Sequence, residues 1–534
     1  MQRLAVLQRR TITARLPSGR PARRAMSTHY QIWIDGRAVD AADGATLPIE
    51  DPSTGIAFAT TALAGVSDVD AAVEAALRCH TTGAWRSKGA AGRGKVLRKA
   101  ADLLRADLPS LVETEVRSTG RPVREFEAQL ARVPEWLEYH ASVAETAEGT
   151  IPRFGDAQDH LAIVRRRPLG VCGLITPWNH PLLIAVKKVS VALASANTVV
   201  LKAPELAPGS VLRLAEIITE AGAPPGAMNV VTGLGSVAGA ALARHPSVSR
   251  IDFTGGNGAG RAIGAAAGAQ LKSVCAELGG NCPVLVFGDT DLEEAVNGVA
   301  FGAFLASGQT CVSAKRILVH ASIFDAFRER LVQKAESLVM GPPMERTTHV
   351  GPLASEAALQ QVESQIARAV SEGASLLTGG GRPPPSRCPL ANSGHWCAPT
   401  VITNVLPHYA CYQDEIFGPV VTLTPFGSHS SDAAEAEAVA LANDNAYALG
   451  AAVWTSDVRR AHRVGERLQA GIIWVNAHHR NAPDAPWGGF GASGVGRENG
   501  IEAFREYTAP VTMIIKTGDG GEDWFAGGHK ARYG

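Results

Sequence analysis

The sequence lacks a long apolar segment and lacks the cysteine spacings of a metal site. No run of 18 or more apolar residues occurs in the 534-residue chain, so no membrane span is expected. The eight cysteines are scattered, without a Cys-x-x-Cys pair or a Cys/His ligand pattern, which predicts no metal site. Scattered single thiols are typical of a reducing compartment. A composition of 46% hydrophobic and 19% charged residues indicates a large globular protein with more than one domain.

Acidic residues are missing from the N-terminal 34 positions, while residues 1–26 contain seven arginines. This composition predicts an organellar transit peptide, with a mitochondrial destination expected and a plastid as the alternative. Translation from Met26 would instead give a shorter, cytosolic product. A basic arm for nucleic acid is the other interpretation. It is disfavoured because 51 basic residues less these seven leaves 44, against 51 acidic residues.

Hydrophobic patterning predicts alternating strands and helices along most of the chain. Residues 31–37 read as a short hairpin strand, and residues 161–167 as a longer strand. Helices are expected at 68–79, at 95–117, and from there to about residue 148 with a kink or break at Pro134. From Gly170 the expected strands are 171–175, 198–201, 228–231 and 251–253, separated by helices at 182–194, 210–221 and 237–244. This alternation predicts a parallel sheet that binds ligands at the carboxyl ends of its strands.

A second series follows, with a strand at 316–319 and helices at 323–340 and 355–372. Residues 379–397 are rich in Gly and Pro and predict a surface loop. The Gly-rich tail ends with Trp524 and Phe525 as candidate anchors to a neighbouring molecule.

Two short motifs offer a specific chemistry. Residues 277–280 read Glu-Leu-Gly-Gly, and residues 308–311 read Gly-Gln-Thr-Cys. A cysteine thiolate attacks electrophilic carbon, and a nearby carboxylate can activate water against the covalent intermediate. Most free cysteines are buried apolar residues instead. The polar surroundings of Cys311 favour the reactive interpretation.

These motifs, 34 residues apart from Glu277 to Cys311, resemble the two signature sequences of the aldehyde dehydrogenase superfamily. The resemblance covers about residues 30–515 and implies NAD(P)+-dependent oxidation of an aldehyde. It implies Cys311 as nucleophile, Asn179 in the oxyanion hole and Glu277 as hydrolytic base. A CoA-acylating relative would not need that base. An inactive protein on the same fold would be expected to lose one of these three residues, and all are present.

Lys202 and Glu205 follow a predicted strand, where a carboxylate can accept from a ribose 2′-OH and repel a 2′-phosphate. A surface salt bridge is the alternative, but the resemblance favours NAD+ over NADP+. The Gly-rich turn at 254–260 can hold a pyrophosphate, although Gly256 replaces the serine usual in the family. The resemblance assigns these positions to the cofactor: Ile175, Thr176, Pro177, Trp178, Lys202, Glu205, Gly235, Phe253, Thr254, Gly255, Gly256, Gly260, Leu278, Glu415 and Phe417.

Lys188 and Glu498 correspond to a family pair thought to carry protons from the active site. An ordinary interdomain salt bridge is the equally open alternative. The substrate pocket is expected to include His180, Lys187, Leu305 and Arg480. Relatives that oxidise betaine or amino aldehydes carry tryptophan at the positions of Lys187 and Leu305. A lysine there and Arg480 at the entrance lead to the hypothesis of an anionic or polar substrate. The alternative is that Lys187 turns outward and pairs with a nearby acid.

The resemblance implies an α/β fold with a Rossmann-like NAD domain, an α/β catalytic domain and a small oligomerisation arm. The expected limits are 27–145 with 169–279 for the NAD domain, 280–499 for the catalytic domain, and 146–168 with 500–516 for the arm, followed by a tail at 517–534. A homodimer or homotetramer follows by analogy alone. The expected partner is a small aldehyde, with no nucleic acid and no membrane.

Overall fold

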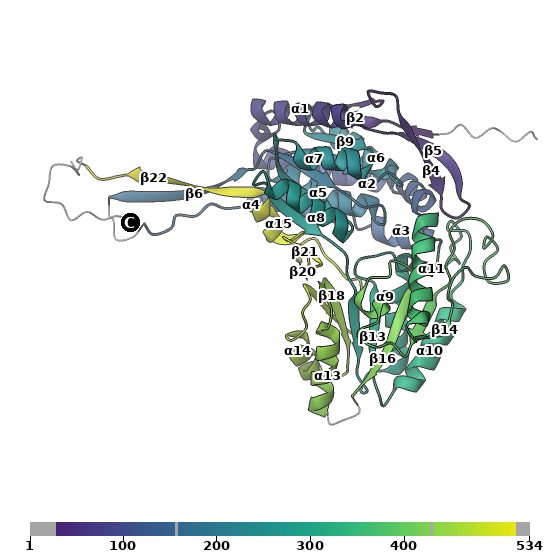
Figure 1. Ribbon diagram of the computed structural model, residues 1–534. Helices are drawn as coiled ribbons and strands as arrows, with labels where there is room; N and C mark the ends of the chain where they lie inside the picture. The colour runs from purple at the N-terminus through teal and green to yellow at the C-terminus, as the bar shows by residue number, and fades with distance from the viewer. Residues whose placement is uncertain (1–27, 155–158, 428–430, 520–534) are drawn as a thin grey trace, which may run out of the picture.

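The computed structural model describes residues 28–154, 159–427 and 431–519. It is a mixed α/β structure with two large sheets in separate lobes and a projecting two-stranded arm (Figure 1). The predicted fold class is confirmed. The predicted transit peptide and the candidate anchors Trp524 and Phe525 lie outside the described residues.

The first sheet has eight strands in the order β21-β11-β10-β7-β8-β9-β2-β3. Its parallel centre consists of β7 (Val171–Ile175), β8 (Thr198–Ala203), β9 (Met228–Thr232), β10 (Val248–Thr254) and β11 (Ser273–Glu277). The hairpin strands β2 (Ile32–Ile34) and β3 (Arg37–Val39) are antiparallel additions at one edge, and β21 (Gly494–Val495) is an antiparallel addition at the other. Strands β7, β8 and β9 are buried along their whole length, which explains why most of their residues are apolar.

Helices cover this sheet close to where the sequence predicts them. They are α1 (Val66–Thr82), α2 (Gly89–Thr119), α5 (Pro181–Ala194), α6 (Gly209–Glu220), α7 (Ala240–Arg244) and α8 (Asn257–Gly268). The helix expected at 237–244 begins as a π-helical turn, Gly235–Gly239, before α7. At Pro134 the chain breaks into α3 (Val123–Leu130) and α4 (Pro134–Thr146).

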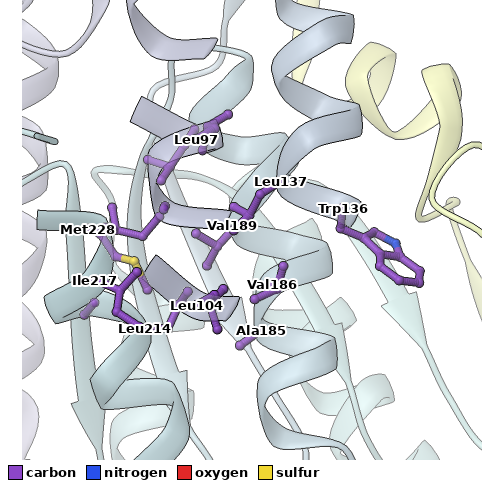
Figure 2. Packing of buried hydrophobic residues seen from close by; sticks show 14 of the residues in the cluster. Leu97, Leu104, Trp136, Leu137, Ala185, Val186, Val189, Leu214, Ile217 and Met228 are labelled. Atoms are coloured by element: carbon purple, nitrogen blue, oxygen red, sulfur yellow. The ribbon is translucent and has the colours of Figure 1, made fainter. Parts of the chain in front are cut away.

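The main core of this lobe lies between α2, α4, α5 and α6 (Figure 2). Leu104 of α2, Leu137 of α4 and Val189 of α5 are fully buried there. Each belongs to the apolar face of its helix. Trp136 is also buried, and its Nε1 donates a hydrogen bond of 2.8 Å to Asn499 Oδ1. This bond ties α4 to the chain segment that follows Glu498, so the active-site segment is anchored in the core.

The second sheet has seven strands in the order β14-β15-β16-β13-β12-β18-β19. They are β12 (Cys282–Val286), β13 (Ala314–His320), β14 (Ser375–Thr378), β15 (Thr400–Thr403), β16 (Val420–Phe426), β18 (Gly450–Trp454) and β19 (Ile472–Val475), of which only β14 runs antiparallel. Its helices are α9 (Leu292–Phe304), α10 (Phe324–Ser337), α11 (Glu356–Ser371), α13 (Ser431–Asn443) and α14 (Val458–Gly465).

The prediction of a surface loop at 379–397 is wrong in part. Cys388, Trp396 and Cys397 in this segment are buried, and Trp396 Nε1 donates to Ser53 O at 3.2 Å. Ser53 lies just after β4 (Thr46–Asp51). This strand forms a three-stranded sheet with β1 (Thr28–Tyr30) and β5 (Ile56–Ala62). The segment therefore joins the two lobes, and its apolar residues serve that contact.

The arm consists of β6 (His160–Pro168) and β22 (Thr508–Lys516), paired antiparallel over nine residues each. It projects away from both lobes in Figure 1. Met513 and Ile514 on β22 are 43% and 52% exposed. The helix α15 (Gly500–Glu506) precedes β22 and packs against α4 and α5, which connects the arm to the first lobe.

Candidate active site

The two lobes meet between Glu277, the last residue of β11, and β12 five residues later. Two glycines, Gly279 and Gly280, lie between them because the surrounding atoms leave no room for a side chain. A Cβ on Gly280 would lie 2.1 Å from the Cys311 carbonyl oxygen, and one on Gly279 would lie 2.4 Å from Glu415 Oε2. The Gly-Gly pair thus lets the end of the first sheet approach the cysteine loop.

The loop before Cys311 is strained and firmly held. Ala306, Ser307 and Gly308 have φ angles of 54°, 53° and 67°, a region that side chains other than glycine rarely adopt. Glu125 accepts from the Ala306 N–H at 3.1 Å, and Lys315 Nζ donates to Gly308 O at 2.9 Å. These contacts fix the direction in which Cys311 leaves the loop.

Cys311 is the half-buried thiol of the chain, whereas the other seven cysteines, all described, are buried. Burial, followed by the carboxyls of Glu415 and Glu277, raises the pKa of Cys311 to about 12. The group is therefore a neutral thiol in this state at neutral pH, and it needs added positive charge to ionise.

Asn179 lies between β7 and α5, at the carboxyl end of the first sheet. Its Nδ2 donates a hydrogen bond of 2.8 Å to Gln309 O, two residues before Cys311. A side-chain amide has two N–H groups, so one N–H remains for another acceptor beside the cysteine. The structure thus brings Asn179 to the loop as the sequence predicts.

Glu277 is 4% exposed, and neither carboxyl oxygen has a hydrogen-bond partner among the described residues. Burial, and next the charge of Glu498, raise its pKa well above the ordinary range. A Cβ on Gly488 would lie 2.6 Å from Glu277 Oε1, so this glycine leaves the room that the carboxyl occupies. An unpartnered buried carboxyl of raised pKa is suited to accept a proton.

Glu498 bridges two adjacent lysines of α5. Its Oε2 lies 2.5 Å from Lys187 Nζ and its Oε1 lies 2.5 Å from Lys188 Nζ. Lys188 also pairs with Asp252, which accepts a hydrogen bond from the Tyr507 hydroxyl at 2.7 Å. The geometry therefore favours the ion-pair interpretation of Lys188 and Glu498. It also corrects the expectation that Lys187 offers a free charge to the substrate: the side chain is buried and does not turn outward, but its ammonium pairs with an acid, Glu498.

The predicted cofactor residues gather at the carboxyl ends of β7, β8 and β10. Ile175 pairs in register with Lys202 across these strands. Lys202 Nζ lies 2.5 Å from Glu205 Oε2, and Glu205 Oε1 accepts from the Gly235 N–H at 3.2 Å. Thr176 is buried next to them, and Pro177 is half-buried.

The Gly-rich turn opens α8, whose first residue follows Gly256. A Cβ on Gly256 would meet nothing within 4 Å, so the helix N-terminus faces open space. Gly255 and Gly260 are glycines for a different reason, which is lack of room for a side chain. A Cβ there would lie 2.5 Å from the Phe253 ring and 2.4 Å from Leu278 Cδ2. These two glycines are dictated by packing within the protein.

Glu415 and Phe417 approach this face from the second lobe. Burial raises the pKa of Glu415 to about 7, and its Oε1 accepts from the Gly280 N–H at 3.2 Å. Phe417 makes an edge-to-face contact with Trp178, with ring centroids 5.8 Å apart. Residues far apart in sequence thus enclose one space between the lobes.

A cavity of about 720 Å³ opens on the other side of Cys311. It exposes Glu277 and Glu498, and all four residues predicted for the substrate pocket line it: His180, Lys187, Leu305 and Arg480. The sequence did not predict four further basic residues on its wall: Arg121, Arg124, Arg132 and Lys334.

Arg121 is the main positioning residue that the sequence analysis missed. Its guanidinium is buried and paired with Glu125 at 3.0 Å, and it donates to Asn179 O at 3.1 Å. It also lies 2.9 Å from His180 Nδ1. Because arginine only donates, that nitrogen must accept, and Nε2 of His180 carries the proton. The charged residue between Gly120 and Pro122, at the end of a helix, was the available signal.

Among the described residues, no helix combines the length and apolar character needed to cross a bilayer. No group of three or more His, Cys, Asp or Glu side chains in the same residues is arranged to hold a metal ion.

Comparison with known proteins gives one consistent family. The chain is 39% identical to phenylacetaldehyde dehydrogenase of Pseudomonas fluorescens over 505 residues, 93% of this chain and 98% of that protein. The crystal structure of an NAD-dependent aldehyde dehydrogenase from Sinorhizobium meliloti matches with a TM-score of 0.89 at 36% identity, covering 94% of this chain and 97% of the other. Betaine aldehyde dehydrogenase from Staphylococcus aureus, in complex with NAD+, matches with a TM-score of 0.89 at 34% identity, covering 93% and 96%. The model of the aldehyde dehydrogenase family matches residues 39–513, and the chain therefore belongs to this family.

Proposed function

We propose that this protein oxidises an aldehyde to a carboxylic acid with NAD+ through a thioester on Cys311. The observation that carries the proposal is the shared cavity wall. Cys311, the half-buried thiol, and Glu277, a buried carboxyl without a partner among the described residues, both line it. Asn179 adds an orientated amide beside the same loop.

The residues divide the reaction as follows. The Cys311 thiolate attacks the aldehyde carbon, and the free N–H of Asn179 with the Cys311 backbone N–H stabilises the oxyanion. The oxyanion then re-forms the carbonyl, the hydride leaves the carbon, and a thioester remains on Cys311. NAD+ bound at the cofactor face would supply the hydride acceptor and positive charge near the thiol. Glu277 then takes a proton from water, the oxygen attacks the thioester carbon, and the C–S bond breaks to release the acid.

The cofactor face fits a dinucleotide. Its features are the open N-terminus of α8 at Gly256, the Lys202–Glu205 pair at the end of β8, and the Glu415 carboxylate facing the diglycine. Thr254 Oγ1 is buried and has no hydrogen-bond partner in the described residues, so a polar group of a ligand would satisfy it. Glu205 would accept from a ribose hydroxyl, and its carboxylate, which shares its charge with Lys202, would occupy the space that a 2′-phosphate needs.

The substrate class follows from the charges at the cavity mouth. Arg121 and Lys187 on the wall are paired with Glu125 and Glu498. Arg124, Lys334 and Arg480 line the cavity without an ion-pair partner in the part of the chain that the structure describes. This leaves the mouth positive, which favours an aldehyde with a distal carboxylate over a cationic one.

Assembly and location are further parts of the proposal. The exposed strand β22 and its apolar residues support pairing of the arm with another copy, giving a homodimer or homotetramer. Import into mitochondria rests on the arginines of residues 1–26 alone, since the relatives compared above are bacterial.

We expect Cys311→Ala to lower aldehyde oxidation by more than about 10³-fold, since the nucleophile is removed. NAD+ binding, followed by fluorescence titration, should be unchanged. Cys79→Ala, at a buried thiol on α1, is the matched control and should keep its activity. Retention of a tenth of the normal turnover in Cys311→Ala would refute the assignment.

Glu277→Gln keeps the shape of the side chain and removes the base. Stopped-flow absorbance should show one burst of NADH per active site, followed by steady-state turnover reduced about 10²–10⁴-fold. In the wild type, steady-state turnover should rise with pH as the Glu277 carboxyl, whose pKa is raised, loses its proton. Unchanged steady-state turnover in the variant would mean that another base acts.

The carboxylate of Glu205 is expected to set cofactor choice. Glu205→Gln should narrow the ratio of kcat/KM for NAD+ over NADP+ by about tenfold, the order expected for a lost contact to a charged group. Glu216→Gln on α6 is the control, since that carboxylate pairs with Arg213 away from the cofactor face. A wild-type preference for NADP+ would overturn the interpretation of Glu205.

For the substrate, kcat/KM of the wild type should favour a semialdehyde with a distal carboxylate over betaine aldehyde. Arg480→Gln and Arg124→Gln should each reduce this preference by about threefold or more, because each removes a charge at the mouth. Arg37→Gln, on the exposed edge strand β3, should not change it. Efficient oxidation of betaine aldehyde by the wild type would contradict the proposed substrate class.

A further inference from the structure

Lys187 and Lys188 hold the Glu498 carboxylate from both sides. Each ammonium lies 2.5 Å from a different oxygen of Glu498, and Lys188 is shared with Asp252. Lys187 is 3% exposed and Lys188 is 1% exposed, so these charges are buried. Two lysines thus balance two carboxylates, and Glu498 is fully engaged.

This arrangement keeps Glu498 ionised. Burial alone would raise its pKa, but Lys187 and Lys188 hold the pKa of Glu498 at about 2. Burial would lower the pKa of Lys188, yet Asp252 and Glu498 raise it. The two ion pairs, with the lowered pKa that they cause, favour Glu498 as a fixed anion over Glu498 as the group that takes the proton of the hydrolytic water.

Glu277 is the carboxyl on the cavity wall that has no hydrogen-bond partner among the described residues. The groups that face it are Lys187 and Lys188 of α5, Asp252 of β10, Glu498 of the late segment, Cys275 on its own strand and the Cys311 thiol across the cavity. Glu498 opposes ionisation of Glu277, and the two lysines favour it. Of these lysines, Lys187 lies on the cavity wall that Glu277 and Cys311 share.

Lys187 is also fixed in place. Its ammonium lies 4.9 Å from the centre of the Trp487 ring, next to Gly488, whose missing side chain leaves room for the Glu277 carboxyl. The lysine, the tryptophan and the glutamate therefore form one wall of the site. With a neutral side chain at position 187, the Glu498 carboxylate would keep only Lys188 as its cation. Glu277 would then face a negative charge that is less well balanced.

We propose that Lys187 is a positioning residue for the general base: it locks Glu498 in its ion pair and provides the positive charge that lets Glu277 take the proton of the hydrolytic water. This inference rests on the proposed role of Glu277. In that step the water oxygen bonds to the thioester carbon, one water proton moves to Glu277, and the C–S bond electrons return to Cys311. Glu277 then returns its proton to solvent through the cavity.

The test compares pH profiles of the burst and of steady-state turnover in the full-length enzyme by stopped flow. In Lys187→Met, the NADH burst should persist, while the acid limb of steady-state turnover moves up by about one pH unit or more. Turnover at neutral pH should fall about tenfold and approach the wild-type value at high pH. Lys187→Arg keeps the charge, so the acid limb of its steady-state pH profile should stay at the wild-type position.

Glu498→Gln provides a change in the opposite direction. It removes the negative neighbour of Glu277 and frees Lys187, so the acid limb should move down. A proton relay through Glu498 predicts instead a loss of hydrolysis at every pH with no downward shift. Lys187→Gln retains a donor to Glu498 and should reproduce the upward shift, which keeps the test available if Lys187→Met fails to fold.

An acid limb that stays at its wild-type position in both neutral variants would overturn the role of Lys187. So would an equal loss of turnover at every pH, which is what a purely structural lysine would cause. Absence of an NADH burst in Glu277→Gln, in which hydrolysis of the thioester is blocked, would instead refute the proposed function, so the two failures are distinguishable.

Discussion

The hydrogen bond from the Asn179 amide to the Gln309 carbonyl is the contact on which the site depends. It joins the end of a strand in the first sheet to the strained loop of the second lobe. The diglycine after Glu277 permits this approach, because any side chain on Gly280 would collide with the Cys311 carbonyl. Arg121, in the turn before α3, and Glu125, on α3, reinforce it by binding the Asn179 and Ala306 backbones. The residues proposed as nucleophile, oxyanion donor and base are thereby held in place by the two lobes, which is what pre-organised catalysis requires.

Much of the fold follows from local pattern. The strands β7 to β10 and the helices α2, α5 and α6 were predicted because their apolar residues recur with the period of buried strands and amphipathic helices. The segment at 379–397 was misjudged because Gly and Pro indicate irregular backbone, not exposure. Trp396 is buried through a partner at Ser53, 343 residues away, which local pattern cannot show. The antiparallel additions β2 and β21 depend on pairing of the same kind.

The site was predictable where a motif places a residue at a strand end. Glu277 ends β11, and Asn179 and Glu205 lie in the segments that follow β7 and β8. Cys311 lies in a loop before β13, and its place beside Asn179 and Glu277 depends on how the two lobes meet. Charge pairing was not predictable. Lys187 and Glu498 are 311 residues apart in the sequence, and only the fold shows that they form an ion pair. Gly255 and Gly260 show the converse error, since motif glycines can be required by Phe253 and Leu278 as well as by a ligand.

The central claim is that the aldehyde is oxidised while bound to Cys311. The most direct measurement is rapid quenching of the Glu277→Gln variant, in which the thioester should accumulate, with aldehyde and NAD+ in acid, followed by peptide mass mapping. The account predicts one acyl group per active site on the peptide that contains Cys311, formed with the same rate constant as the first NADH. An acyl group on another peptide, or NADH formed with no acylated peptide during turnover, would contradict it.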